Sequence, residues 1–405
     1  MKENFEIAMN VFIFGYDILL FRMFDTIRNT ISQFQDHEWI ILIVVVAVFL
    51  IRLLYLILFT GKILFAKNNV AGEPQALSLI LTFRNEEDNL GKNLPAVLNI
   101  GQGNFEVIAV DDFSTDNSMI VLGALKERYE RLRYSSISQE TWFSVKMAQN
   151  IALKAAKNRW VMVIPPSVCE YSDHWISAVS SSVTEKSDIV VNYSNVKHDG
   201  SFYNRLYRAE LFSQQLRSFG FILNGLPYVV SEDNVAFRKD RYFLTGGYRE
   251  KVKESYANLE LLINSFIKKK NTRLVFSPDT VVLRNEVINK INFYDLLKKE
   301  IQIRKYLPFL RRIFITLDEF TGCLFLPVAV ILYIFMPDLW VPLVTVLGLT
   351  VFFKMFIIKK ALSRLKERKL FLTSLIYGLF FPCYKLGYRF YYNYYSRRKK
   401  WKSKR

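Results

Sequence analysis

An almost unbroken apolar run from Trp39 to Phe59 restricts how this chain can fold more than any other feature of its sequence. Arg52 is the one charged residue in the run, and about 20 apolar residues suffice to cross the hydrocarbon core of a bilayer. Trp39 at one edge and Lys62 beyond the other match the aromatic and basic residues that anchor a span at its two interfaces. The run therefore predicts a transmembrane helix over residues 39–62.

Two further apolar runs lie near the other end of the chain, at Leu317–Phe335 and Trp340–Ile358. The four residues between them, Met336-Pro337-Asp338-Leu339, include a proline, and proline interrupts helices. Helices joined by so short a connection are antiparallel neighbours. We expect a transmembrane hairpin over residues 317–358.

Basic residues flank these apolar runs. The formal net charge is +18, and much of it lies between residues 359 and 369 and in the tail from Arg397 to Arg405. Lysine and arginine beside apolar spans are typical of the cytoplasmic side of a membrane, where they meet anionic lipids. No nucleic-acid-binding motif accompanies the charge. We therefore expect anionic membrane lipids as partners, no nucleic acid, and an inside location for the chain from residue 62 to the hairpin.

The N-terminal unit, residues 1–38, carries weaker signals. Residues 8–23 are apolar but are interrupted by Asp17 and Arg22. An amphipathic helix in the plane of the membrane and a poor first span both remain open for this segment.

The C-terminal unit, residues 359–405, consists of a basic loop, a short apolar segment at Leu370–Tyr384 and a basic tail. Pro382 lies within the apolar segment. If the segment crossed the bilayer, the basic tail would lie outside, against the preference of basic residues for the inner side. We therefore expect an interfacial or re-entrant helix.

Residues 75–310 alternate between strand and helix patterns and predict a soluble domain. Ala76–Phe83 and Phe105–Val110 are apolar runs typical of strands that are buried on both faces. Asp111 and Asp112 stand where the second strand must end. Ligands bind at such carboxyl ends in open α/β sheets, although acids that only end a strand and cap a helix give the same pattern. The alternation predicts an α/β fold with a mostly parallel sheet.

Three stretches after the first span, LSLILTFRNEEDNL, FEVIAVDDFSTDNS and VKMAQNIALKAAKNRWVMVI, together resemble the glycosyltransferase family 2 domain. The bacterial members with an N-terminal span and a C-terminal hairpin are the most similar. The resemblance implies a GT-A (Rossmann-like) domain at residues 75–310, with N- and C-terminal transmembrane helices in the bacterial inner (cytoplasmic) membrane. It also implies a nucleotide-sugar donor, a lipid-linked or glycan acceptor, a partner glycosyltransferase, and a role in assembling cell-envelope polysaccharide or glycolipid.

In that family, the loop after the first strand and the acid that ends the second strand hold the nucleotide of the donor. The stretch from Gly225 to Lys239 resembles the family segment near the acceptor pocket. The resemblance implies substrate-binding roles for the matching residues, which are Thr82, Arg84, Asn85, Glu86, Asp111, Asp112 and Lys146.

The DxD motif, with which the family holds a divalent cation, is changed in this chain. Pro165, Pro166 and Ser167 take its place after the strand VMVI. A proline side chain cannot bind a cation, and a serine hydroxyl is neutral. We therefore expect no metal site, and neither Mg²⁺ nor Mn²⁺ as a cofactor.

The acid pair that supplies the general base in the family is also changed. Its slots in SYANLELL are Ala257, Asn258 and Leu259, and an amide cannot accept a proton at neutral pH. Glu260 is the one carboxylate in this stretch, which makes it the candidate catalytic residue.

The QxxRW motif, which grips the acceptor side in the family, has a weak counterpart in Gln302, Lys305 and Tyr306. Lysine keeps the charge of arginine but lacks its bidentate fork. An ungapped count brings a different set to these positions, namely Leu296, Lys298 and Lys299.

Three hypotheses account for this pattern. In the first, a catalytically impaired or inactive membrane glycosyltransferase-like protein still binds a nucleotide sugar, a lipid-linked glycan or a partner enzyme. In the second, the protein is an active metal-independent glycosyltransferase, with Lys146 facing the phosphate charge and Glu260 as the base. In the third, it is a non-catalytic membrane scaffold or partner subunit. Changes at the metal, base and acceptor positions together favour the first, because charge stabilisation, proton transfer and positioning are affected at once.

Overall fold

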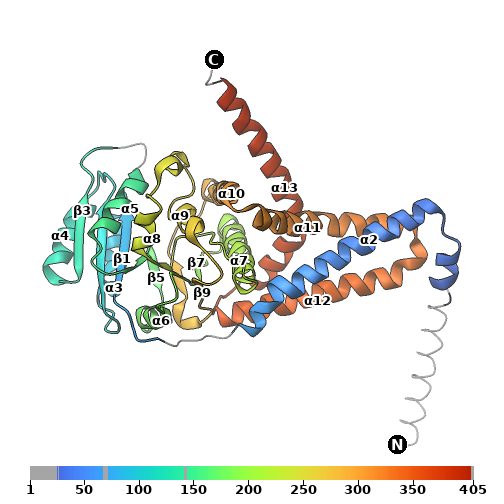
Figure 1. Cartoon of the computed structure of the whole chain (residues 1–405), viewed down its shortest axis with the longest axis horizontal. Helices are drawn as coiled ribbons and strands as arrows, with labels where there is room; N and C mark the ends of the chain where they lie inside the picture. The colour runs from blue at the N-terminus through green and yellow to red at the C-terminus, as the bar shows by residue number, and fades with distance from the viewer. Residues whose placement is uncertain (1–24, 26, 67–71, 141–143, 403–405) are drawn as a thin grey trace, which may run out of the picture.

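The computed structural model describes residues 25, 27–66, 72–140 and 144–402. An α/β unit lies beside a bundle of long helices that project from one side of it (Figure 1). The prediction of a mainly parallel sheet with membrane-length helices toward both ends of the chain is confirmed. The segment at residues 8–23 lies outside the described residues.

A seven-stranded sheet forms the centre of the α/β unit, in the spatial order β3 (Leu132–Ser136), β2 (Phe105–Asp111), β1 (Leu77–Phe83), β4 (Trp160–Val163), β8 (Val235–Arg238), β6 (Ile189–Val191) and β9 (Thr272–Leu274). The first four strands are parallel, and β8 is antiparallel to both of its neighbours. The carboxyl ends of β1, β2 and β4 therefore lie at one edge of the sheet, which is where ligands bind in open α/β folds.

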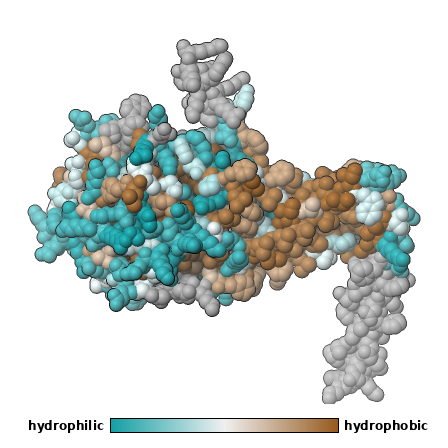
Figure 2. Space-filling model, viewed as in Figure 1, coloured by the Kyte–Doolittle hydropathy of each residue, from teal (hydrophilic) through white to brown (hydrophobic). Residues whose placement is uncertain are grey.

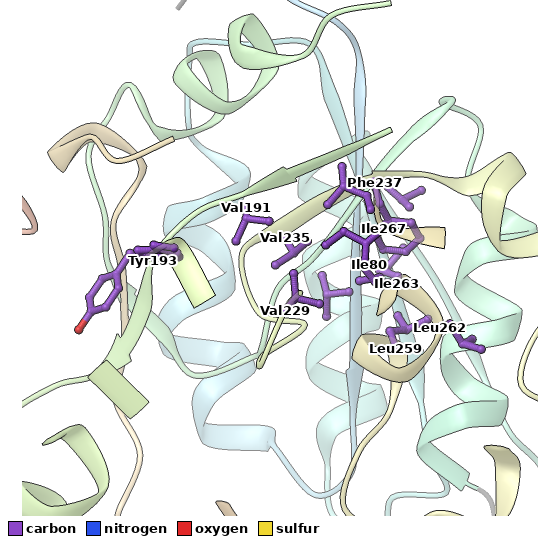
Figure 3. Close-up of a cluster of buried hydrophobic side chains, with 14 of the residues drawn as sticks. Ile80, Val191, Tyr193, Val229, Val235, Phe237, Leu259, Leu262, Ile263 and Ile267 are labelled. Carbon is purple, nitrogen blue, oxygen red and sulfur yellow. The ribbon is translucent and has the colours of Figure 1, made fainter. Parts of the chain in front are cut away.

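Helices cover both faces of this sheet, because successive side chains of a strand point to opposite faces. Leu79 and Leu81 of β1 belong to a buried cluster with residues of α3 (Glu87–Leu98) and α4 (Ser118–Arg128). Ile80 belongs to a second cluster, with residues of α5 (Ser144–Ala155) and α9 (Leu259–Phe266). Figure 3 shows Ile80 in this second cluster, together with Phe237 and Ile263. The remaining short helices are α6 (Trp175–Ser182), α8 (Lys239–Leu244) and the 3₁₀ turns Arg249–Lys253 and Pro278–Thr280.

A small second sheet extends the edge where the parallel strands end. It consists of β5 (Val168–Glu170), β10 (Val282–Arg284) and β7 (Ser194–Val196), with β10 antiparallel to β5 and parallel to β7. The N–H of Asn285 donates to the carbonyl oxygen of Ser167 at 2.8 Å. The end of β10 is therefore held against the segment that follows β4.

Within the described residues, three helices are long and apolar enough to cross a membrane. The first runs from Asp36 to Phe65, as α2 (Asp36–Tyr55) followed by a π turn and a 3₁₀ turn. The others are α11 (Phe309–Phe335) and α12 (Trp340–Arg364), joined by the 3₁₀ turn Pro337–Leu339. Apolar residues cover this bundle, whereas polar residues dominate the surface of the α/β unit (Figure 2).

Two more helices connect the bundle to the α/β unit: α7 (Phe202–Leu223) and α10 (Lys290–Tyr306). A third, α13 (Phe371–Lys402), runs across the direction of the bundle and packs against α11 and α7 (Figure 1). Pro382 does not end α13, because the carbonyl oxygen of Gly378, which the missing proline N–H leaves free, accepts from Lys354 Nζ of α12 at 2.5 Å.

The connection between α12 and α13 is tied to the α/β unit by a buried ion pair. Arg208 Nη2 of α7 lies 2.6 Å from Glu367 Oε2, and these two side chains are 2% and 0% exposed. The other carboxylate oxygen of Glu367 accepts from Tyr193 Oη and Asn195 Nδ2, both at 2.8 Å. These contacts fix the end of the hairpin that follows α12 to β7 and α7.

Candidate functional site

The carboxyl ends of β1 and β2 bring together the two loops in which we expect a nucleotide to bind. The N–H of Asp112 donates to the carbonyl oxygen of Phe83 at 2.8 Å, so Asp112 lies beside the loop at residues 84–86. Asp112 is only 2% exposed. Thr82, the residue before Phe83 in β1, is half-buried and pairs with Val110 of β2. These residues share one edge of the sheet.

Asp111 and Asn85 fix the shape of these loops. The Asp111 carboxylate accepts from the N–H of Ser114 at 3.1 Å, and Asn85 Oδ1 accepts from the N–H of Thr115 at 2.8 Å. Asn85 has φ +55°, in the left-handed region that asparagine tolerates better than most residues. Both side chains therefore support the loop itself.

Arg84 and Glu86 flank Asn85 in different surroundings. Arg84 Nη2 lies 2.7 Å from Glu140 Oε1, and the Arg84 side chain is 37% exposed. Glu86 accepts from Asn89 at 2.6 Å, and burial raises the pKa of its carboxyl group. Arg84 is thus a basic group at the open edge of the sheet, within reach of an anionic ligand.

Lys146 binds the segment that carries the altered base position. Its Nζ donates to the carbonyl oxygen of Glu254 at 2.5 Å and to Asn258 Oδ1 at 3.1 Å. Burial lowers the pKa of this ammonium group. The structure therefore brings together two positions that the sequence analysis treated as parts of the donor and acceptor sides.

The three residues that resemble a QxxRW motif hold the same segment from the other side. Gln302 Oε1 accepts from the N–H of Tyr256 at 2.9 Å and from that of Ala257 at 3.1 Å. Lys305 Nζ and Tyr306 Oη each lie 2.7 Å from Glu254 Oε1. The last turns of α10 therefore position the loop that precedes α9.

Glu260, the candidate catalytic carboxylate, is fully buried in an ion pair. Its Oε1 lies 2.5 Å from Lys299 Nζ, and its side chain is 0% exposed. Next to it, Glu232 accepts from the N–H of Leu259 at 2.7 Å and from Gln149 Nε2 at 3.0 Å. Burial, and then the charge of Glu260, raises the pKa of the Glu232 carboxyl group well above its usual range. The pKa of the Lys299 ammonium group is raised, because the negative charges of Glu260 and Glu232 outweigh the opposing effect of burial.

Acidic residues from distant segments gather where the metal-binding motif would lie. Ser167 Oγ donates to Glu286 Oε1 at 2.7 Å. Arg284 Nη1 lies 3.1 Å from the same Glu286 oxygen and 3.2 Å from Asp233 Oδ2. Two carboxylates are therefore present, and a guanidinium group already occupies the position between them.

A recess of about 190 Å³ opens beside this cluster. Its charged lining residues include Arg284, Asp233, Glu286 and Lys299. In the described part of the chain, no group of three or more His, Cys, Asp or Glu side chains could hold a metal ion. Two carboxylates paired with an arginine do not supply the oxygen cage that Mg²⁺ or Mn²⁺ requires. The residues present do not fit a divalent cation.

The sequence predicted no role for four residues of this cluster, namely Glu232, Asp233, Arg284 and Glu286. Lys299 was named only as an alternative at the QxxRW positions. Signals for two of the four were present, because Glu232 and Asp233 are adjacent acids in a stretch that is otherwise mostly apolar. Arg284 and Glu286 lie at the end of a three-residue strand, which carries little periodicity.

Comparison with known proteins places this geometry in context. A family model described as Glycosyl transferase family 2 matches residues 78–240. Glycosyltransferase GlyG of Streptococcus pneumoniae is 28% identical over 132 residues, which make up 32% of this chain and 43% of that protein. The chain thus matches less than half the length of that curated relative.

Two solved structures resemble the chain to different extents. Mannosyltransferase PcManGT from Pyrobaculum calidifontis, in complex with GDP-Man and Mn²⁺, superposes with a TM-score of 0.52 at 16% identity, over 84% of this chain and 98% of that one. S. aureus TarS 1-349, in complex with UDP-GlcNAc, gives a TM-score of 0.41 at 13% identity, over 77% of this chain and 92% of that one. The PcManGT likeness shows that the α/β unit has a GT-A-type fold.

Proposed function

We propose that this chain, in which residues 78–240 match the Glycosyl transferase family 2 model, binds a nucleotide sugar without a divalent cation and transfers the sugar poorly or not at all. The main support is a difference along one edge of the sheet, between the loops after β1 and β2 and the segment after β4. The loops after β1 and β2 keep their acids and their close pairing, with Asp112 bound to Phe83. The segment after β4 has lost its metal ligands and contacts a salt-bridged arginine instead.

The charges explain why binding and turnover separate in this proposal. A departing nucleoside diphosphate needs positive charge to stabilise it. Arg284 is held by both Asp233 and Glu286, so the three groups together carry a net negative charge. Lys146 is bound to the 254–258 segment. Neither basic group is left to balance the leaving diphosphate.

Metal-independent transfer is the second candidate, and Glu232 is the observation that favours it. A carboxyl group with a raised pKa is suited to general acid–base work near neutral pH. Glu232 lies beside Glu260 and Lys299, at the altered base position. In this version Glu232 accepts the proton of the acceptor hydroxyl, with Glu260 and Lys299 setting its charge.

The membrane helices suggest where the protein acts. We propose a multi-pass protein of the bacterial cytoplasmic membrane whose α/β unit faces the cytoplasm, with α13 along the interface. Its acceptor is a lipid-linked or other glycan of cell-envelope assembly, alone or with a partner glycosyltransferase. The orientation of α13 across the bundle and the basic loop at residues 359–369 support this placement.

The test is a scan of nucleotide sugars against the detergent-purified full chain, with and without Mn²⁺, scored by calorimetry and by sugar release. We expect cation-independent binding that Asp112→Ala abolishes. Asp88→Ala, an exposed acid paired only with Lys92, serves as the matched control and should bind like the wild type.

The possible results separate the hypotheses. Binding without turnover supports the proposal, and cation-independent transfer that Glu232→Gln stops supports the second candidate. Absence of any nucleotide binding leaves the scaffold hypothesis. Mn²⁺-stimulated transfer by the wild type would refute the proposal.

A further inference from the structure

A cavity with a mostly apolar lining that also includes charged residues lies inside the helix bundle, away from the recess beside Arg284. It has a volume of about 110 Å³ and is enclosed by α2, the π turn that follows it, α7, α11, α12 and α13. Its surroundings combine apolar helix faces with charged side chains, which are rare in membrane-spanning helices and mark functional sites there. The charged lining residues are Arg52, Arg217, Lys354, Lys385, Glu210, Asp318 and Glu319.

Basic groups outnumber acidic groups in the ion-paired network around this cavity. Arg52 pairs with Asp318 at 2.5 Å, and Lys385 pairs with Glu210 at 2.5 Å. In the part of the chain that the structure describes, this network joins five basic side chains to four carboxylates: Arg52, Arg217, Arg304, Lys385 and Arg389 with Glu210, Glu300, Asp318 and Glu319. Lys354, a sixth basic side chain, also lines the cavity.

Lys354 is the basic residue without an acidic partner. Among the described residues no carboxylate lies within ion-pair distance of its Nζ, which donates to the carbonyl oxygen of Gly378. A Cβ at residue 378 would lie 2.6 Å from this Nζ, so only glycine leaves room for the contact. One of the three ammonium hydrogens is thereby used. A buried, unpaired ammonium group is costly unless an anion compensates it.

Two hydroxyl groups of the cavity lining also lack partners. Tyr55 Oη of α2 and Ser374 Oγ of α13 are buried and have no hydrogen-bond partner in the described structure. These residues are 7% and 6% exposed, so water reaches them poorly. These two hydroxyl donors line the same cavity as the Lys354 ammonium group and the Arg52 guanidinium group, and such donors are the kind that a phosphate binds.

We propose that this cavity binds the phosphate group of an anionic membrane lipid. The phosphate accepts from Lys354, Tyr55 and Ser374 and balances the excess positive charge. Lys354 lies ten residues before the inner end of α12, a distance of about 15 Å at 1.5 Å per residue. The apolar outer faces of α2 and α12 leave space for acyl chains along the bundle (Figure 2). This site is independent of sugar transfer.

The experiment measures lipid binding to the full chain in detergent micelles by native mass spectrometry and fluorescence titration. The probes are dioleoyl phosphatidic acid, dioleoylglycerol, which has the same acyl chains without phosphate, and inorganic phosphate. We expect phosphatidic acid to bind at least about tenfold more tightly than either of the other two.

Three variants locate the site. Lys354→Met should weaken phosphatidic acid binding about tenfold, since it removes the unpaired charge. The double variant Tyr55→Phe/Ser374→Ala should weaken it several-fold with folding intact, because neither hydroxyl group has a protein partner to lose. Lys360→Met, an exposed position on the same helix, should bind like the wild type.

Each remaining result overturns the proposal. Equal affinity for dioleoylglycerol would show that acyl chains alone determine binding. Equal affinity for inorganic phosphate would assign the cavity to a soluble anion. Wild-type affinity in a folded Tyr55→Phe/Ser374→Ala protein, or an equal loss in Lys360→Met, would place the lipid elsewhere.

Discussion

Removing the Glu367 carboxylate tests how firmly the membrane hairpin is joined to the α/β unit. Glu367→Ala deletes the ion pair with Arg208 and the bonds from Tyr193 and Asn195. It leaves the Arg208 guanidinium, whose side chain is 2% exposed, without its counter-charge. Breaking a buried pair by removing one partner costs about 3–5 kcal/mol, because the remaining charge stays desolvated.

Replacing both partners should cost less than replacing one. In Arg208→Met/Glu367→Leu no charge remains buried, and apolar replacement of a buried ion pair is often neutral. A double-mutant cycle should therefore give a coupling free energy of at least about 2 kcal/mol between the two positions.

The assay is urea unfolding of the detergent-solubilised chain, followed by tryptophan fluorescence for Arg208→Met, Glu367→Leu, Glu367→Ala and the double variant. Arg368→Ala, next to Glu367 and exposed, is the control and should change stability by less than about 0.5 kcal/mol. Additive effects of the two single apolar changes would refute the reasoning, because they would show that the pair has no mutual dependence.

Two further predictions concern the charged residues at and beside the recess. The raised pKa of Glu232 favours its protonated form in the folded state. The stability that this carboxyl group contributes is therefore present at low pH, and it is lost as the pH rises above about 4.5 through the pKa of the folded state. The free energy of unfolding of Glu232→Gln should therefore rise relative to that of the wild type between pH 5 and pH 8. The same pH dependence in both proteins would contradict this, and so would an equal gain in the exposed control Glu185→Gln. Pro165→Asp/Ser167→Asp should not acquire Mn²⁺ binding while Arg284 holds the neighbouring acids, whereas adding Arg284→Gln should give a Mn²⁺-dependent rise in unfolding temperature. Equal Mn²⁺ binding by both variants would show that Arg284 does not block the position.

The pattern of apolar residues along the sequence was enough to predict the strands and helices that form from long apolar segments. The strands β1 and β2 and the three membrane-length helices follow from long, mostly apolar runs, because such runs have few ways to avoid water. The family resemblance grouped Asp112 with the 84–86 loop. The structure places the two side by side, because the parallel strands β1 and β2 end at one edge of the sheet. The resemblance to a known family added the roles expected of those residues.

Pairings between distant segments could not be predicted in this way. Glu260 lies on a helix whose sequence gives no sign of Lys299, and Arg284 lies on a strand of three residues. Lys146 was expected at the donor phosphates, but the structure bonds it to Asn258. Such contacts depend on how helices pack around the sheet.

Pro382 shows the same limit within one helix. Proline removes a backbone donor and normally interrupts a helix. In α13 the donor is replaced by Lys354, which belongs to a different helix. No inspection of residues 370–384 alone could have revealed that replacement.

Two adjacent residues of α10 contact different parts of the molecule, one beside the recess and one in the helix bundle. Lys299 reaches Glu260 beside the recess, whereas Glu300 contacts Arg217 and Lys385 at the bundle. A small rotation of α10 about its own axis would alter both sets of contacts together. Two adjacent residues of one helix therefore couple the packing of the bundle to the charged groups beside the recess.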